Sequence, residues 1–152
     1  MKTNLCVPNC LEFVLIKRKF HVDKKKIARE LKLKDDGIDI NAVVLNKFLE
    51  QYNLRCSHLS PFLNLETDLI LKENLIPEKD VLAAYDGSRI FRTGSQHTKH
   101  FSVVISYNIL DDLIRLFDPP ANQFDVKLIS LNNSMQARED ERYGFYVISA
   151  FS

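Results

Sequence analysis

The sequence of 152 residues lacks the features that mark a membrane-spanning, repeat-built or phosphate-binding protein. No apolar run approaches the roughly 18 residues that a membrane-spanning helix needs, because charged residues interrupt every hydrophobic stretch. Only four glycines are present, and they form no glycine-rich phosphate loop. Internal repeats and low-complexity tracts are also missing. We therefore expect a compact globular protein without membrane insertion.

An excess of charge of one sign is lacking too. The 21 Lys and Arg residues are almost balanced by 20 Asp and Glu residues, which leaves a formal net charge of +1. Proteins that bind nucleic acid or an anionic membrane surface usually carry a clear basic excess. We expect no nucleic acid partner, so a small substrate, a peptide or a protein remains as the class of ligand.

Cysteine is scarce and odd in number, with Cys6, Cys10 and Cys56. An odd count argues against a fully disulfide-paired secreted protein, and residues 1–5 contain no apolar core of a signal peptide. We expect a cytoplasmic location, with export without a cleavable signal left open. A disulfide between Cys6 and Cys10 is geometrically feasible but disfavoured in a reducing compartment, and it would switch off a catalytic thiol.

The chain length fits one domain over residues 1–152. Apolar spacing predicts three helices before any strong strand, over residues 11–20, 23–33 and 41–52. Asp23 is the expected N-cap of the second helix. Pro8 is tolerated only in the first turn of a helix, so Cys6 is expected at or just before the N-terminus of the first one.

Short β segments dominate the prediction for the second half of the chain. Alternation and turn residues predict strands over residues 80–85, 89–92, 101–107, 113–118 and 143–151. The mixed-charge run 138–142 is expected to be an exposed loop before the last strand. Helices followed by antiparallel strands are typical of the α+β class.

Two of these strands are expected to pair as a β-hairpin around Asp111 and Asp112. A turn centred between about residues 109 and 111 would place His100 opposite or nearly opposite Asp118, at the open end of the hairpin. Pro119 and Pro120 would end the second strand there. The sequence therefore predicts a carboxylate beside an imidazole.

Cys6, His100 and Asp118 are the parts of a cysteine nucleophile with its base and its orienting group. The thiolate is the reactive form, and a helix N-terminus and a nearby imidazolium both lower the pKa of a thiol. Asp118 would hold the imidazole in the useful tautomer and stabilise its charged form. The predicted reaction is attack of sulfur on an amide or related acyl carbon, which gives a thioester.

The chain resembles the C39-type bacteriocin-processing peptidases, a bacterial branch of the papain-like cysteine proteases. The resemblance spans about residues 4–120 and is carried by Cys6-x-x-x-Cys10, residues 37–54, His100-Phe101-Ser102-Val103-Val104 and Phe117-Asp118-Pro119. It implies an α+β papain-like fold in which N-terminal helices pack on a mainly antiparallel sheet. It also implies Cys6 as nucleophile, His100 as general base and acid, Asp118 as orienter, and Cys10 as the family's second, non-catalytic cysteine.

Two departures from the family pattern keep other functions open. Family members usually carry a glutamine before the nucleophile that helps bind the oxyanion, and a glycine directly after it. Here no glutamine precedes Cys6, Asn4 is the nearest amide and so the oxyanion candidate, and Val7 replaces the glycine. The expected function is a peptidase acting on a peptide or protein substrate. A protein glutamine deamidase or acyltransferase with the same triad and a catalytically inactive binding module are the alternatives. A partner protein or transporter is left unidentified.

Soft metal ligands are present but poorly spaced. The combinations Cys6 with Cys10, Cys56 with His58 and His97 with His100 all lack the compact paired spacing of a zinc module. We therefore expect no metal and no cofactor. Cys56 and His58 are instead expected to flank a strand after the third helix.

Overall fold

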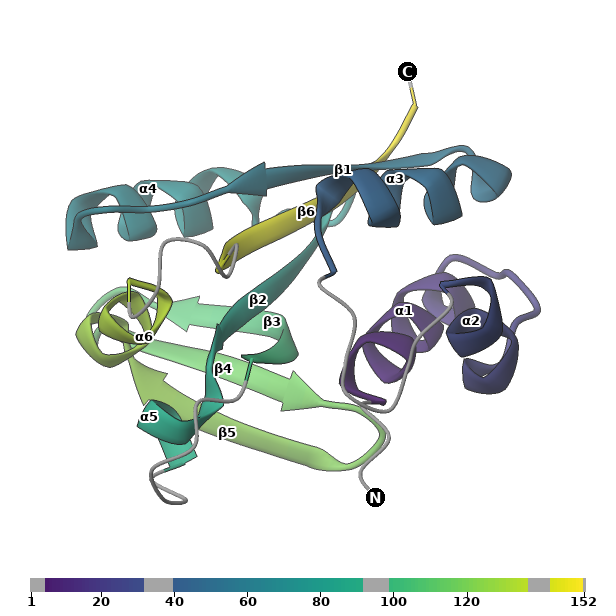
Figure 1. Cartoon of the computed structure of the whole chain (residues 1–152). Coiled ribbons are helices and arrows are strands. Elements are labelled where there is room, and N and C mark those ends of the chain that lie inside the picture. The colour runs from purple at the N-terminus through teal and green to yellow at the C-terminus, as the bar shows by residue number, and fades with distance from the viewer. Residues whose placement is uncertain (1–4, 32–39, 92–98, 137–142, 152) are drawn as a thin grey trace.

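The computed structural model describes residues 5–31, 40–91, 99–136 and 143–151 (Figure 1). Six antiparallel strands form one sheet in the order β1-β6-β2-β3-β4-β5. The strands are β1 (Leu54–Leu59), β2 (Asp80–Asp86), β3 (Lys99–Asn108), β4 (Leu113–Asp118), β5 (Asn122–Lys127) and β6 (Gly144–Ala150). The α+β class expected from the sequence is confirmed.

Three helices precede the first strand, as predicted, and three more lie between later strands. The helices are α1 (Cys6–Lys17), α2 (Lys24–Glu30), α3 (Ala42–Leu49), α4 (Asn64–Asn74), α5 (Gly87–Phe91) and α6 (Leu128–Met135), and a short 3-10 turn, η1 (Glu50–Tyr52), follows α3. Among the described residues, no helix is long and apolar enough to cross a membrane.

Side-chain caps explain where α2 and α3 begin. The Asp23 carboxylate accepts a hydrogen bond from the backbone N–H of Lys26 at 2.8 Å, which confirms the predicted N-cap. Asn41 does the same for Val44 at 3.1 Å. Both helices therefore begin where a short polar side chain satisfies an N–H that has no partner within the helix.

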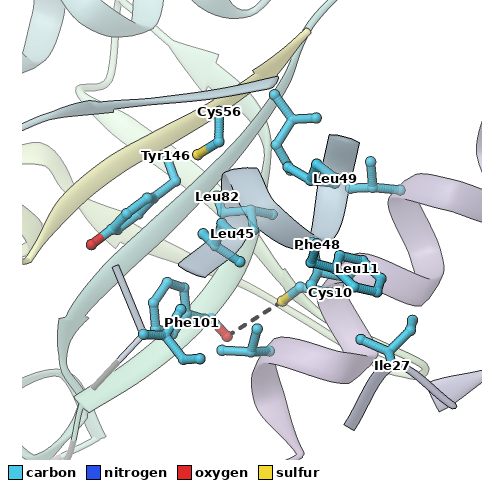
Figure 2. Packing of buried hydrophobic residues seen from close by; sticks show 14 of the residues in the cluster. Cys10, Leu11, Ile27, Leu45, Phe48, Leu49, Cys56, Leu82, Phe101 and Tyr146 are labelled. Carbon is cyan, nitrogen blue, oxygen red and sulfur yellow. Dashed lines mark hydrogen bonds between the residues drawn. The ribbon is translucent and has the colours of Figure 1, made fainter. Parts of the chain in front are cut away.

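Helices cover both faces of the sheet and divide the core in two. One cluster joins α1, α2 and α3 to the sheet, and Figure 2 shows its centre around Leu11, Leu45 and Phe101. The other cluster lies under α4 and α6, around Leu71 and Leu131. The strand β2 is buried along its whole length because its successive side chains enter the two clusters alternately.

The prediction of a strand over residues 89–92 is wrong. The Asp86 carboxylate accepts hydrogen bonds from the backbone N–H and the hydroxyl of Ser88, at 3.0 and 2.6 Å, where the chain turns out of β2. The short helix α5 then runs from Gly87 to Phe91. A local side-chain cap thus overrides the β preference of Ile90 and Phe91.

Three other elements have no counterpart in the sequence prediction. Helix α4 buries only Thr67, Leu71 and Asn74, so its apolar residues form no regular stripe. Helix α6 and the edge strand β5 mix polar and apolar residues in the same way. Several expected features lie outside the described residues: Asn4, His97 and the charged run 138–142.

Candidate active site

Helix α1 presents Cys6 at its first position. The helix begins at Cys6, and Pro8 lies within its first turn, as its missing N–H requires. Edge-to-face packing of Phe13 on Phe117, with ring centroids 5.1 Å apart, holds α1 against β4. The helix also contacts β3. The N-terminus of α1 and its thiol are thereby fixed beside the strands that carry the predicted base.

The hairpin of β3 and β4 forms in the predicted register. Val103 pairs with Phe117 and Val104 with Leu116. Continuing this register by one residue puts Ser102 opposite Asp118, so His100 lies diagonal to that carboxylate on the same face of the sheet. The predicted proximity of His100 and Asp118 is confirmed.

The imidazole of His100 contacts the carboxylate of Asp118 directly. Nε2 of His100 lies 3.0 Å from Oδ2 of Asp118, and the two side chains are 24% and 23% exposed. Because an ionised carboxylate only accepts hydrogen bonds, Nε2 carries the proton in this contact. Nδ1 is then the ring nitrogen that can exchange a proton with a thiol or a leaving group.

Two buried hydroxyl groups extend a chain of hydrogen bonds from the Asp118 carboxylate into the protein interior. Ser102 Oγ donates to Oδ1 of Asp118 at 2.5 Å, and Tyr85 Oη lies 2.7 Å from Ser102 Oγ. Ser102 and Tyr85 are both fully buried, at 0% exposure. Neither residue was predicted from the sequence as a member of the site. The signal present in the sequence is a serine within an otherwise apolar strand, since buried hydroxyls need partners.

Aromatic rings support the imidazole on two sides. The ring of Tyr85 meets His100 in an edge-to-face arrangement with centroids 5.6 Å apart. Phe91 of α5 does the same at 5.4 Å and contacts Phe124 of β5 as well. The helix that replaces the predicted strand over residues 89–92 therefore contributes a wall of the candidate site.

Cys6 lies close to this pair, next to the backbone of β3. Burial has the largest effect on the thiol and raises the pKa of Cys6 to about 11. Hydrogen bonding from the backbone of Phe101, the residue after His100, lowers this pKa, while the negative charge of Asp118 raises it. The thiol is therefore protonated at neutral pH, contrary to the lowering expected from the helix N-terminus.

Cys10 packs in the core one turn after Cys6. Its thiol donates to the carbonyl of Phe101 at 3.6 Å, the contact drawn in Figure 2, and burial raises its pKa well above the ordinary value. Within the part of the chain that the structure describes, no disulfide joins Cys6, Cys10 or Cys56. Cys10 thus helps to hold α1 on β3 beside the nucleophile candidate.

The other soft ligands do not come together at this site. Cys56 and His58 lie within β1 rather than flanking a strand. Nε2 of His58 is 2.9 Å from the carbonyl oxygen of Tyr143, and its ring stacks on Tyr146. Within the described ranges, no group of three His, Cys, Asp or Glu side chains could hold a metal ion.

Comparison with known proteins identifies the fold. No family model matches the sequence, and no curated protein matches it. Among solved structures, one similar chain is a double glycine motif protease from an AMS/PCAT transporter, crystallised in complex with the leader peptide. The two superpose with a TM-score of 0.66 and 15% sequence identity, over 99% of this chain and 88% of that chain. The papain-like arrangement of helices on an antiparallel sheet is therefore confirmed.

Proposed function

We propose that this chain is a cysteine-dependent amide hydrolase that cleaves peptide bonds, with Cys6 as nucleophile, His100 as general base and acid, and Asp118 as the orienting group. The observation that carries the proposal is the 3.0 Å contact between Nε2 of His100 and Oδ2 of Asp118. Phe101, the residue after His100 in β3, hydrogen-bonds the thiol of Cys6 through its backbone. The fold shared with a double glycine motif protease supports it.

The proposed reaction has two half-steps. Sulfur of Cys6 bonds to the substrate carbonyl carbon as the thiol proton passes to Nδ1 of His100, and a tetrahedral oxyanion forms. Collapse of this intermediate breaks the C–N bond, and the same proton goes to the leaving amine. Water then attacks the thioester, giving one proton to His100, and the thiol and a free carboxyl group are released.

The raised pKa of Cys6 selects one version of this mechanism. With a pKa of about 11, about one molecule in 10⁴ carries a thiolate at pH 7. We therefore propose that the neutral thiol with a neutral imidazole, rather than a resting thiolate–imidazolium pair, is the reactive state. Proton transfer from Cys6 to His100 accompanies the attack, so catalysis depends on a neutral His100 with the correct tautomer.

The N-terminus of α1 is proposed to stabilise the oxyanion. A helix start concentrates N–H groups and a partial positive charge, which favours negative charge that develops nearby. Cys6 is the first residue of α1, so an acyl group on its sulfur would lie at that end. Asn4 stays the candidate for an additional side-chain donor, in the place of the family's glutamine.

The proposed substrate is a peptide or protein segment, and a peptide with two consecutive glycines is the first probe. The protein of similar fold is described as a double glycine motif protease and was crystallised with the leader peptide. Small residues would let the scissile carbonyl approach a thiol that is only partly exposed. We further propose that residues 1–152 act as one domain in the cytoplasm, without metal or cofactor.

The test combines cleavage and trapping. The protein is incubated with leader-like peptides that contain a Gly-Gly pair, and products are identified by mass spectrometry. The expected result is backbone cleavage that Cys6→Ala abolishes, with Cys56→Ala as the matched control that retains it. A peptide aldehyde ending in Gly-Gly should form a reversible adduct on Cys6.

Two outcomes would overturn the proposal. Release of ammonia from a glutamine-containing peptide whose backbone stays intact would assign a deamidase. Saturable peptide binding with neither cleavage nor an aldehyde adduct would assign a binding module that keeps the fold without turnover.

A further inference from the structure

We propose that Ser102 and Tyr85 are positioning residues, which hold the carboxylate of Asp118 so that it fixes one tautomer and one orientation of His100. This inference deepens the proposed function and rests on it. It assigns a role to two residues outside the proposed triad, both of which lie beneath it in the sheet.

The distances define the direction of each hydrogen bond. Oδ2 of Asp118 faces Nε2 of His100 at 3.0 Å, and Oδ1 faces the hydroxyl of Ser102 at 2.5 Å. Because the carboxylate has no proton to give, Ser102 donates to it. The hydroxyl of Tyr85, 2.7 Å from Ser102 Oγ, then donates to Ser102. The donors run in one direction from Tyr85 through Ser102 to the carboxylate.

Each carboxylate oxygen therefore has its own partner. A carboxylate bound only through Oδ2 could rotate about its side-chain bonds and offer either oxygen to the imidazole or to water. The bond from Ser102 to Oδ1 removes that freedom. Since a bond to an ionised acceptor is about twice as strong as one between neutral groups, a single hydroxyl is sufficient to fix the rotamer.

Burial strengthens this arrangement on the protein side. Ser102 and Tyr85 are at 0% exposure, whereas the side chains of His100 and Asp118 are 24% and 23% exposed. Water can compete for the exposed pair but not for the buried hydroxyls. The rigid end of the chain of hydrogen bonds is thus inside the sheet, and the reactive end faces the solvent.

Strand pairing explains why Tyr85 can contact both His100 and Ser102. Tyr85 pairs with His100 across β2 and β3, and Ala83 pairs with Ser102. Tyr85 therefore reaches the imidazole with its ring edge and Ser102 with its hydroxyl. Three adjacent strands, β2, β3 and β4, supply the four members, so sheet geometry alone sets their spacing.

Expected effects follow the position of each residue in this chain of donors. Ser102→Ala removes the only described hydroxyl contact to Asp118 Oδ1 and should lower kcat by about 10- to 100-fold with KM within about twofold. Ser102→Thr keeps a hydroxyl and should recover most of kcat. Tyr85→Phe keeps the ring but removes the second donor, so its loss should be smaller, about 3- to 10-fold.

The experiment measures the tautomer of His100 as well as the rate of cleavage. Ring nitrogens of the whole protein are labelled with ¹⁵N, and the tautomer of neutral His100 is measured by NMR in the wild-type protein and each variant. The wild-type protein should show a single tautomer with the proton on Nε2. Ser102→Ala should show a mixture, and Ser102→Thr should restore the single form.

Matched controls separate this role from general loss of packing. Ser134→Ala removes a buried serine hydroxyl that donates to the Leu131 carbonyl at 2.6 Å, away from the site. Tyr107→Phe removes a phenol hydroxyl that donates to Asp68 at 2.6 Å. Both controls should leave the tautomer of His100 and kcat unchanged, and thermal unfolding should show comparable losses of stability in control and test variants.

The outcomes distinguish this inference from the proposed function. An unchanged single tautomer in Ser102→Ala overturns the positioning role, whatever the activity is. A mixed tautomer with unchanged kcat leaves the structural contact but overturns its part in the reaction. If the wild-type protein cleaves no peptide, the proposed function fails, and the tautomer measurement still decides whether the hydroxyls orient His100.

Discussion

Two regions of the molecule each contain a cysteine and a histidine, and they differ in what the histidine contacts. On the edge strand β1, Nε2 of His58 lies 2.9 Å from the carbonyl oxygen of Tyr143. On β3, Nε2 of His100 lies 3.0 Å from the carboxylate of Asp118. Both partners accept a hydrogen bond and can fix a tautomer. Only the carboxylate also supplies the negative charge that stabilises an imidazolium during proton transfer.

Residue types alone do not separate these two regions. Cys56 and His58 are closer in sequence than Cys6 and His100, yet His58 stacks on Tyr146 with ring centroids 4.5 Å apart and Cys56 is buried in the core. Cys56 and His58 therefore contribute to core packing. The partner of the imidazole, rather than the presence of a thiol nearby, separates a candidate base from a structural histidine.

The largest expected effect comes from removing the charge of Asp118. Asp118→Asn should lower kcat/KM for the cleaved peptide by roughly 10²- to 10⁴-fold, because the amide can present its N–H to Nε2 and select the wrong tautomer. His58→Gln, which keeps a donor for the Tyr143 carbonyl, should stay within about twofold of wild type. Steady-state kinetics on both variants would measure the difference. Equal losses of kcat/KM in Asp118→Asn and His58→Gln would show that the partner of the imidazole does not distinguish the two histidines.

A second prediction separates stability from activity at the β1 end of the sheet. Gly144 has φ +134°, and a Cβ there would lie 2.6 Å from the backbone oxygen of Leu59 and 3.1 Å from Nε2 of His58. Gly144→Ala should therefore destabilise the fold by about 1–3 kcal/mol in urea unfolding, with kcat of the folded fraction unchanged. Ser149→Ala on the same strand is the control, expected to change stability by less than about 0.5 kcal/mol. A loss of kcat in Gly144→Ala would show that the two regions are coupled.

The smallest expected effect is a difference in thiol reactivity. Burial raises the pKa of Cys6 to about 11 and that of Cys56 to about 12. Because the thiolate is the form that reacts, alkylation of Cys6 should accelerate with each pH unit from pH 7 to 10 and remain faster than that of Cys56, which is more deeply buried. Mass spectrometry of each site over this pH range would measure both rates. A plateau for Cys6 below pH 8, lost in His100→Ala, would instead establish a resting thiolate–imidazolium pair.

Elements with strong local signals could be predicted from the sequence. The strand over residues 113–118 is observed with the same bounds, and Asp23 caps its helix, because each depends on neighbouring residues alone. The proximity of His100 and Asp118 followed from the register of one hairpin. Helix α4 was missed because the residues that it buries, Thr67, Leu71 and Asn74, are not a regular apolar stripe in the sequence.

The parts of the site that escaped prediction depend on contacts between distant segments. The hydroxyls of Ser102 and Tyr85 meet because β2 and β3 pair in one register out of several that the sequence allows. The pKa of Cys6 depends on how closely α1 packs on β3, which no local pattern encodes. Burial changes the pKa of Cys6 more than the helix N-terminus does, and the extent of burial depends on tertiary packing.

The buried carboxylate of Asp80, the first residue of β2, anchors the C-terminal end of α1. Arg18, just after the C-terminus of α1, donates from Nε to Asp80 at 2.9 Å, and Lys17 pairs with the same carboxylate. A 12-residue helix is about 18 Å long, so a tilt of a few degrees about this anchor would displace the thiol at the opposite end by about 1 Å. The same strand carries Tyr85 near its other end. The helix that carries the proposed nucleophile is thus anchored to one end of the strand whose other end contacts the proposed base, His100.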